Sequence, residues 1–207
     1  MLNCGQGCVC AKRFIIAEPL YDRFLAGAQK ALATIKAGDP MQKDTNIGPL
    51  ASGKQRDTLV DQVDRSVKAG ATLVTGGKAV DGPGFFFEPA ILTDIKKGNP
   101  AYSEEFFGPV FLMSKVKDEA EAIALANDTL FGLASTVFSE DKERAARVAA
   151  QIDAGMVFIN HPAWTAPDLP FGGVKHSGHG RELSRLGIQE FVNKKLIRTQ
   201  DAPSQAL

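Results

Sequence analysis

The chain has 207 residues, of which 44% are apolar and 23% charged, a composition typical of a globular protein with a buried core. Lys and Arg together number 24, as do Asp and Glu, so no basic surplus favours nucleic acid or an anionic membrane. No apolar stretch approaches a membrane span, and residues 1–4 lack the features of a signal peptide. The three cysteines lie within the first ten residues and form no disulfide framework, so we expect a reducing, cytoplasmic setting.

The first half of the chain alternates strand-like and helix-like segments. Residues 13–17 predict a strand, and Pro19 begins a helix that ends at the Gly-Asp-Pro sequence of residues 38–40. Residues 52–69 predict a second helix, because apolar side chains recur every four residues. Further strands are expected at residues 71–75, 86–92 and 110–116.

The second half continues this alternation. Residues 118–127 predict a helix with Asp118 as its N-cap. A strand at residues 133–138, a helix at 141–152 and a strand at 155–160 are expected next. The whole pattern predicts an α/β fold in which helices cover a mostly parallel sheet.

The last third ends in a loop and an isolated strand. Residues 161–180 are dense in Pro and Gly and too long for a passive connection. A short helix near residues 181–186 is expected to precede a strand from Phe191 to Thr199, which has no partner nearby in sequence. Because an unpaired strand is a template for strand addition, we expect it to pair in another molecule.

The first segment that could carry chemistry contains Cys8, preceded by glycines on both sides of Gln6. These glycines allow a tight turn, and a thiol displayed there beside backbone N–H groups suits attack on a carbonyl carbon. Two other interpretations compete. The spacing of Cys4, Cys8 and Cys10 could bind a metal, but no second ligand pair follows, so we expect no metal site. Buried, inert thiols are the other alternative.

The second segment places Glu104 and Glu105 before an aromatic-Gly-Pro turn. One carboxylate could bind a diol such as a ribose, and Phe107 could contact a flat ligand. Taken alone, the segment is better explained as a turn at a strand edge with solvated acidic side chains.

The third segment, residues 169–182, is rich in glycine. It lacks the Gly-Lys-Ser or Gly-Lys-Thr sequence of a phosphate-binding loop, which argues against a nucleoside triphosphate. A loop that closes one wall of a pocket, with Phe171 as an apolar contact, fits better. His161, His176 and His179 are more typical of surface histidines than of an acid–base or metal site.

Together these segments resemble the aldehyde dehydrogenase superfamily, and the similarity is colinear over residues 3–199. The matching residues are Gly5, Gln6, Cys8 and Arg13; Glu105, Phe107, Gly108, Pro109 and Val110; Asn127, Asp128, Thr129, Phe131, Gly132, Leu133 and Ala134; Gly155, Val157, Ile159 and Asn160; and Pro170, Phe171, Gly172, Gly173, Lys175, Ser177, Gly178, Gly180, Arg181 and Glu182. The resemblance implies that Cys8 is the catalytic nucleophile. It also implies that Glu105 and Phe107 help to bind the ribose and ring of a nicotinamide cofactor, NAD or NADP.

Within that superfamily, the sequences around Cys8 and around residues 158–162 resemble succinate-semialdehyde dehydrogenases most. Those enzymes often hold the substrate carboxylate with an arginine six residues before the cysteine, where this chain has Leu2. They also tend to place a serine before the Pro-Phe-Gly-Gly turn, where Thr165 and Ala166 stand. The resemblance therefore predicts a substrate pocket containing Thr165 and Phe171, and leaves the aldehyde open.

The resemblance also implies a division of the chain. Residues 1–180 would form the cysteine-bearing catalytic domain, and residues 181–207 a helix, an oligomerisation strand and a tail. The chain would thus be the C-terminal, catalytic half of the enzyme. The family's N-terminal dinucleotide-binding domain, its general base and its oxyanion asparagine are expected outside this chain. The intact enzyme would oxidise an aldehyde through a thiohemiacetal and a thioester on Cys8, and this chain alone would be inactive. A non-catalytic assembly or regulatory fragment is the alternative.

Cys8 and Cys10 also allow a redox hypothesis. Two residues apart in an extended segment, their Cα atoms would lie near the upper limit for a disulfide. Similar enzymes with this spacing imply that a strained, reducible bridge could block the nucleophile.

Overall fold

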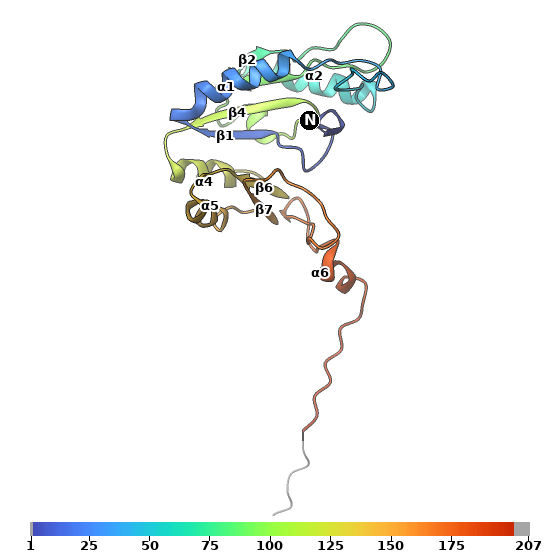
Figure 1. Ribbon diagram of the computed structural model, residues 1–207, viewed down its shortest axis with the longest axis vertical. Coiled ribbons are helices and arrows are strands. Elements are labelled where there is room, and N and C mark those ends of the chain that lie inside the picture. The colour runs from blue at the N-terminus through green and yellow to red at the C-terminus, as the bar shows by residue number, and fades with distance from the viewer. Residues whose placement is uncertain (1, 201–207) are drawn as a thin grey trace, which may run out of the picture.

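A four-stranded sheet forms the centre of the computed structural model, which describes residues 2–200 (Figure 1). Its strands are β1 (Arg13–Ala17), β2 (Thr72–Thr75), β3 (Ala90–Thr93) and β4 (Val110–Val116). They lie in the order β1-β4-β3-β2, with β4 parallel to both β1 and β3, and with β2 antiparallel to β3. The sheet is therefore mostly parallel.

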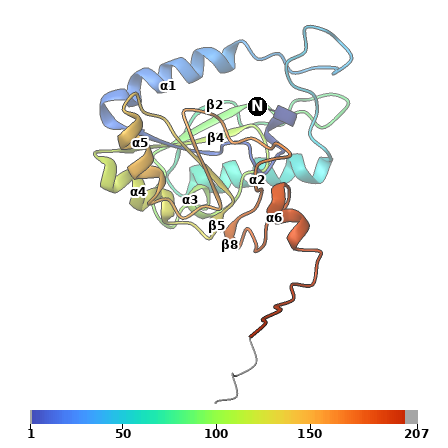
Figure 2. The same ribbon diagram turned by 60° about the horizontal axis from the view of Figure 1, so that its bottom comes forward.

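Helices cover both faces of this sheet. Successive strand side chains point to opposite faces, so Ile91 of β3 packs under α1 (Glu18–Ala33), whereas Leu92 packs under α2 (Gly53–Lys68). Figure 2 shows α1 and α2 with strands β2 and β4 between them. All four residues of β3 are buried, as expected for a strand covered on both sides.

Side-chain caps set where several helices begin. The Ser52 hydroxyl accepts a hydrogen bond from the Gln55 N–H at the start of α2. Asp118 does the same for α4 (Glu119–Asn127), and Asp141 for α5 (Lys142–Ala149). Such caps satisfy backbone N–H groups that the first helical turn leaves without partners. None of the helices within residues 2–200 is long and apolar enough to cross a membrane.

Residues 118–189, here called the C-terminal lobe, contain two small sheets and lie below the central sheet in Figure 1. Besides α4 and α5, the lobe contains β5 (Phe131–Gly132), β6 (Ala134–Val137), β7 (Met156–Ile159), β8 (Val174–Lys175) and α6 (Ser184–Gln189). β6 and β7 are parallel, whereas β5 and β8 are antiparallel.

Arg13 links the lobe to the central sheet. Its guanidinium donates to the carbonyls of Leu125, at 2.6 Å, and Ala126, at 3.2 Å, at the end of α4. These carbonyls have no partners within the helix, and a cation is favourable there. Arg13, which the sequence grouped with the cysteine motif, thus has a structural contact away from the thiol.

The predicted α/β fold with a mostly parallel sheet is confirmed, and several boundaries are corrected. The strand predicted at residues 86–92 begins only at Ala90, because Pro89 has no N–H and Phe87 makes an isolated bridge to Ala79. The predicted strand at residues 133–138 is β6, with β5 as a separate two-residue strand before it. The last helix is α6, a few residues later than expected.

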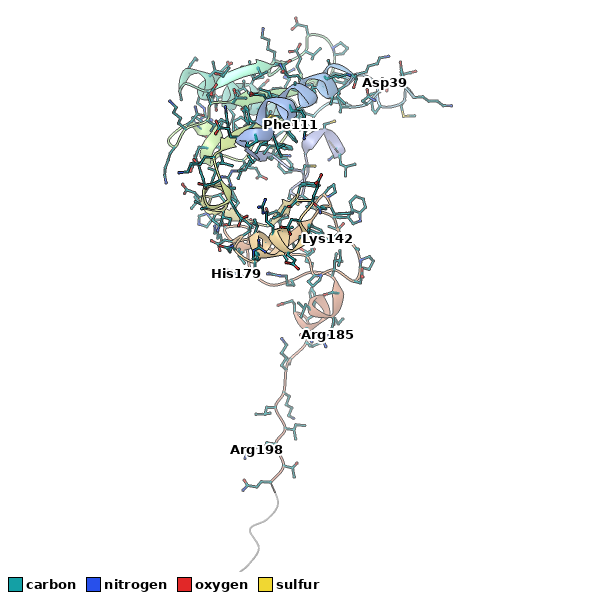
Figure 3. All side chains as sticks on the ribbon, turned by 60° about the vertical axis from the view of Figure 1, so that its left-hand side comes forward. Asp39, Phe111, Lys142, His179, Arg185 and Arg198 are labelled. Atoms are coloured by element: carbon teal, nitrogen blue, oxygen red, sulfur yellow. The ribbon has the colours of Figure 1, made fainter. Side chains whose placement is uncertain are left out.

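The strand predicted from Phe191 to Thr199 is not formed within this chain. Residues 191–200 contain neither helix nor strand, and they run away from the body with Arg198 on them (Figures 1 and 3). A strand needs a hydrogen-bonding neighbour, and within residues 2–200 this segment has none. Pairing with another molecule stays a prediction. The tail at residues 201–207 lies outside the described residues.

Candidate active site

The three cysteines occupy different environments in residues 3–12, here called the cysteine loop. Cys8 is exposed in a turn closed by the Cys10 N–H and the Gly7 carbonyl, 3.0 Å apart. Cys4 is buried, and its thiol donates to the Gly48 carbonyl; burial raises the pKa of this thiol. Cys4 therefore fits the inert alternative, whereas Cys8 alone is presented to solvent.

Cys10 is half-buried, and its thiol donates to the Leu2 carbonyl at 3.4 Å. The segment between Cys8 and Cys10 was expected to be extended and is instead part of the turn. Glycine at position 7 leaves space for the Cys10 side chain, since a Cβ there would lie 3.2 Å from the Cys10 sulfur, a tight contact. The premise of an extended spacing is thus wrong, while a disulfide between the two stays a hypothesis.

Gly5 and Gln6, which precede the turn, anchor the cysteine loop. The Gln6 side-chain oxygen accepts from the Ala51 N–H at 2.8 Å, which ties the loop to the start of α2. Gly5 has φ 73° and lies so close to the Gly108 carbonyl that a Cβ would overlap it. Only glycine allows both the conformation and this approach, so Gly5 brings the loop against the Gly108-Pro109 turn.

Residues 104–107, here called the acid–aromatic segment, are held by the polar face of α2. The Gln55 side chain donates to the Phe107 carbonyl at 2.7 Å, and the Gln62 side chain donates to the Glu105 carbonyl at 3.1 Å. Arg65 makes a bidentate pair with Glu104, with N–O distances of 2.7 and 2.8 Å. The segment is thus fixed by three side chains of one helix.

The two predicted acids have different roles. Arg65 holds the pKa of Glu104 below its ordinary range through hydrogen bonds, and Gln62 adds to this effect while partial burial opposes it. Glu105 is exposed, and no side chain within residues 2–200 bonds its carboxylate. Glu105 is therefore the acid available to a ligand, whereas Glu104 is occupied by the fold.

The cysteine loop and the acid–aromatic segment meet at Lys12 and Phe107. The Lys12 ammonium lies 5.9 Å from the centroid of the half-buried Phe107 ring. Cys8, Glu105 and Phe107, predicted from two separate stretches of sequence, therefore belong to neighbouring segments. The residues that hold them there, Gln55, Gln62 and Arg65, were not predicted. Their spacing of seven and three residues on one helix was the available signal.

Thr165 and Phe171 lie in the C-terminal lobe. Thr165 is exposed in the loop after β7. Phe171 is half-buried, and its backbone N–H and carbonyl are both hydrogen-bonded to the backbone of Glu182. No hydrogen bond within residues 2–200 joins either residue to the cysteine loop. The structure thus brings together the first two predicted segments but does not show the third beside them.

The glycine-rich segment packs into the lobe itself. The Gly132 N–H donates to the Ser177 hydroxyl at 3.0 Å, and the Gly155 N–H donates to the Gly132 carbonyl at 2.9 Å. The Lys175 ammonium donates to the Asn127 carbonyl, at 2.9 Å. These motif residues support one another, which gives them a structural role.

Other candidate sites are less favourable. The three histidines are exposed, with His179 on the lobe in Figure 3, and residues 2–200 contain no cluster of His, Cys, Asp or Glu suited to a metal. A cavity of about 470 Å³ lies between β4 and α4, lined in part by Tyr21, Lys115, Glu121 and Asp128. Its walls include no residue of the cysteine loop, so we place the candidate site at the exposed Cys8.

Comparison with known proteins identifies the family. Residues 1–197 match the aldehyde dehydrogenase family. The chain is 47% identical to an NADP+ succinate-semialdehyde dehydrogenase of Deinococcus radiodurans, covering 98% of this chain and 43% of that protein. It thus spans less than half the length of this curated relative.

Solved structures of aldehyde dehydrogenases are also similar to this chain. Succinic semialdehyde dehydrogenase from Streptococcus pyogenes, in complex with NADP+, matches with a TM-score of 0.93 and 47% identity over 96% of this chain and 44% of that one. Betaine aldehyde dehydrogenase from Staphylococcus aureus, in complex with NAD+, matches with a TM-score of 0.88 and 34% identity over 97% of this chain and 42% of that one.

The pair between Glu104 and Arg65 predicts a specific pH dependence. Because the pKa of Glu104 is lowered on folding, its contribution to stability is present above the ordinary carboxyl range and is lost as the pH falls through the lowered value. Glu104→Gln should therefore lower the urea midpoint of unfolding at pH 7, and the difference from wild type should shrink towards pH 3. Glu105→Gln is the matched control and should leave the midpoint unchanged. An effect of Glu104→Gln that is the same at both pH values would contradict the prediction.

Proposed function

This chain belongs to the aldehyde dehydrogenase family, and we propose that it supplies the nucleophile for the NAD- or NADP-dependent oxidation of an aldehyde to its carboxylic acid. The observation that carries the proposal is the exposed thiol of Cys8 on a turn anchored against the acid–aromatic segment. Because the chain spans 43% of its Deinococcus relative, the activity is proposed for a family-length protein. A reducing, cytoplasmic setting is part of the proposal, since the thiol must stay reduced.

In this proposal the Cys8 sulfur attacks the carbonyl carbon of the aldehyde and forms a thiohemiacetal. The carbonyl oxygen gains negative charge, and the Cys8 N–H can donate to it, since no acceptor within residues 2–200 takes that N–H. Loss of hydride leaves a thioester on Cys8, and water then releases the acid and restores the thiol. We propose that the base that activates this water comes from the remaining length of the family-length protein.

Glu105 and Phe107 fit a nicotinamide cofactor. The exposed carboxylate of Glu105 can accept hydrogen bonds from both hydroxyls of a ribose, and the ring of Phe107 offers an apolar surface beside it. The cofactor, when bound, accepts the hydride. NAD and NADP share the nicotinamide ribose, so these two residues fit either one.

The substrate pocket is proposed to include Thr165 and Phe171. Succinate semialdehyde is one candidate, because the chain resembles enzymes of that name in Deinococcus radiodurans and Streptococcus pyogenes. Its carboxylate would need a cation, and the exposed Leu2 offers none. An uncharged aldehyde is therefore an equal candidate on the residues of this chain.

A reconstituted protein tests this function. The part of the Deinococcus relative that precedes the region matched by this chain is fused to the start of the chain. The fusion should restore aldehyde-dependent reduction of NAD or NADP, measured at 340 nm. Cys8→Ala in the fusion should abolish it, because no other exposed thiol lies in the described part of the cysteine loop. Cys4→Ala, which removes a buried thiol, is the control and should retain turnover.

The chain alone should show no turnover, and turnover by pure chain would contradict the claim that further length is needed. The alternative is a non-catalytic assembly or regulatory fragment. It is supported by the same observation, that the chain covers only 43% of its Deinococcus relative. It requires an inactive fusion and a Cys8 thiol that iodoacetamide alkylates no faster than Cys10.

The segment from Phe191 to Thr199 is proposed to pair with a second copy of this chain. Phe191, Leu196 and Ile197 are 89%, 90% and 78% exposed, and adjacent apolar exposure of this kind marks an interaction surface. Sedimentation velocity at micromolar concentration should therefore give a dimer or larger assembly. Leu196→Lys should shift it towards monomer, whereas Met41→Lys, at another exposed apolar position, should not. A monomeric wild type would contradict the assignment.

Cys10 is proposed as a redox partner of Cys8. Mild oxidation should join the two sulfurs, lower the mass of the chain by two hydrogens and prevent alkylation of Cys8, and dithiothreitol should reverse both changes. Cys10→Ser is the matched variant and should keep Cys8 open to alkylation under the same oxidant. Fragmentation mass spectrometry that finds no Cys8–Cys10 linkage in oxidised protein would refute the pairing.

A further inference from the structure

Three of the four buried polar side chains within residues 2–200 belong to one hydrogen-bonded network. They are Gln62 and Ser66 of α2, which are 7% and 0% exposed, and Asn99, which is 4% exposed. The Asn99 side chain donates to the Ser66 carbonyl at 2.8 Å, and the Ser66 hydroxyl donates to the Gln62 carbonyl at 2.7 Å. Burying polar groups is unfavourable unless they are hydrogen-bonded, so a satisfied network of this kind makes the structure around it rigid.

The network holds residues 99–105, which contain the short helix α3 (Pro100–Ser103), against α2 at both ends. At the first end, Asn99 caps α3 and bonds Ser66. At the other end, the Gln62 amide nitrogen donates to the Glu104 carboxylate and to the Glu105 carbonyl, both at 3.1 Å. Gln62 and Ser66 are four residues apart and so lie on one face of α2. The backbone that leads to Glu105 is therefore tied to a single helix face.

Gln62 also helps to determine which of the two acids faces outward. Glu104 has extended backbone angles, φ −87° and ψ 148°, and in extended backbone successive side chains point to opposite sides. The Glu104 carboxylate is turned towards α2, where Gln62 and Arg65 bind it. The side chain of Glu105 is thereby directed away from α2, and it is exposed.

We propose that Gln62 is a positioning residue, which holds the Glu105 backbone in the orientation in which the Glu105 carboxylate meets the ribose of the cofactor. The inference deepens the proposed function, since it takes Glu105 as the group that binds the ribose. Its basis is the pair of hydrogen bonds from one buried amide to two successive residues. Because Gln62 is buried, it acts through Glu105, and its loss should weaken cofactor binding while the carboxylate remains.

Hydrogen–deuterium exchange tests the inference on this chain as it stands. Gln62→Met removes both hydrogen bonds at similar side-chain length, and mass spectrometry follows exchange of the amides of residues 104–108. Their exchange should become about threefold faster or more, because their backbone loses a contact with α2. Gln62→Asn, which keeps the amide but shortens the side chain by one methylene, is a second variant and should act in the same direction. Exchange in β1 should stay as in wild type.

Ser66→Ala is the matched control, since it removes another buried polar group from the same face of α2. The Ser66 hydroxyl bonds only a carbonyl of its own helix, and the Ser66 carbonyl that accepts from Asn99 remains in the variant. Exchange at residues 104–108 should therefore stay close to wild type, and urea midpoints show that each variant is folded. Unchanged exchange there in the two Gln62 variants would overturn the inference, as would an equal increase in Ser66→Ala.

A second measurement uses the fusion protein described above, with Cys8→Ala in place, and follows the binding of NADPH by its fluorescence. Gln62→Met should raise the Kd by about fivefold, as expected when one hydrogen bond that orders a binding group is lost. Ser66→Ala should not. In the fusion that retains Cys8, Gln62→Met should raise the cofactor KM by the same factor and leave the aldehyde KM and kcat close to wild type. A variant that is merely less stable would instead lose kcat at unchanged KM.

Failure of the inference and failure of the proposed function give different results. A fusion that binds no cofactor and oxidises no aldehyde, together with faster exchange in Gln62→Met, would refute the proposed function alone. An active fusion in which Gln62→Met leaves the cofactor KM unchanged would refute the role of Gln62 alone.

Discussion

The close approach of Gly5 to the Gly108 carbonyl is the constraint on which the candidate site depends. It joins a loop at one end of the chain to a turn about a hundred residues later, with no space for a side chain between them. Once this contact is made, the turn that bears Cys8 has little freedom relative to Glu105 and Phe107. The hydrogen bond between Gln6 and Ala51 removes more of that freedom. If Cys8 is the nucleophile that we propose, it needs no large rearrangement to meet a bound substrate.

The other side of Gly108 is occupied by Leu59, a fully buried residue of α2. The apolar face of α2 thus sets the position of the turn, and its polar face holds the acid–aromatic segment through Gln55, Gln62 and Arg65. One amphipathic helix therefore both packs against the sheet and orients the candidate site. A substitution in the core beneath α2 would therefore displace the candidate site through this helix.

The sequence predicted the α/β fold well because the signal is local. Strand β1, the cap at Asp118 and the alternation of elements all follow from periodicity and from single residues. It could not distinguish Glu104 from Glu105, since their difference depends on Arg65, which is distant in sequence and adjacent only in the fold. The strand predicted at residues 191–199 shows the same limit. Its apolar pattern is real, but a strand forms only with a neighbour, and residues 2–200 provide none.

Resemblance to a family motif does not by itself separate chemistry from support. Asn127 lies in one of the matched stretches, yet its side chain bonds the Gln151 carbonyl and the Asp153 N–H, and so ties the end of α4 to the turn before β7. Lys175, from another matched stretch, adds an ion pair with Asp153 at 3.6 Å. Substitution of either residue would loosen the C-terminal lobe and could abolish activity without removing any reacting group. Cys8 differs because its side chain is exposed and has no structural partner within the described residues, so a loss on its substitution would report on chemistry.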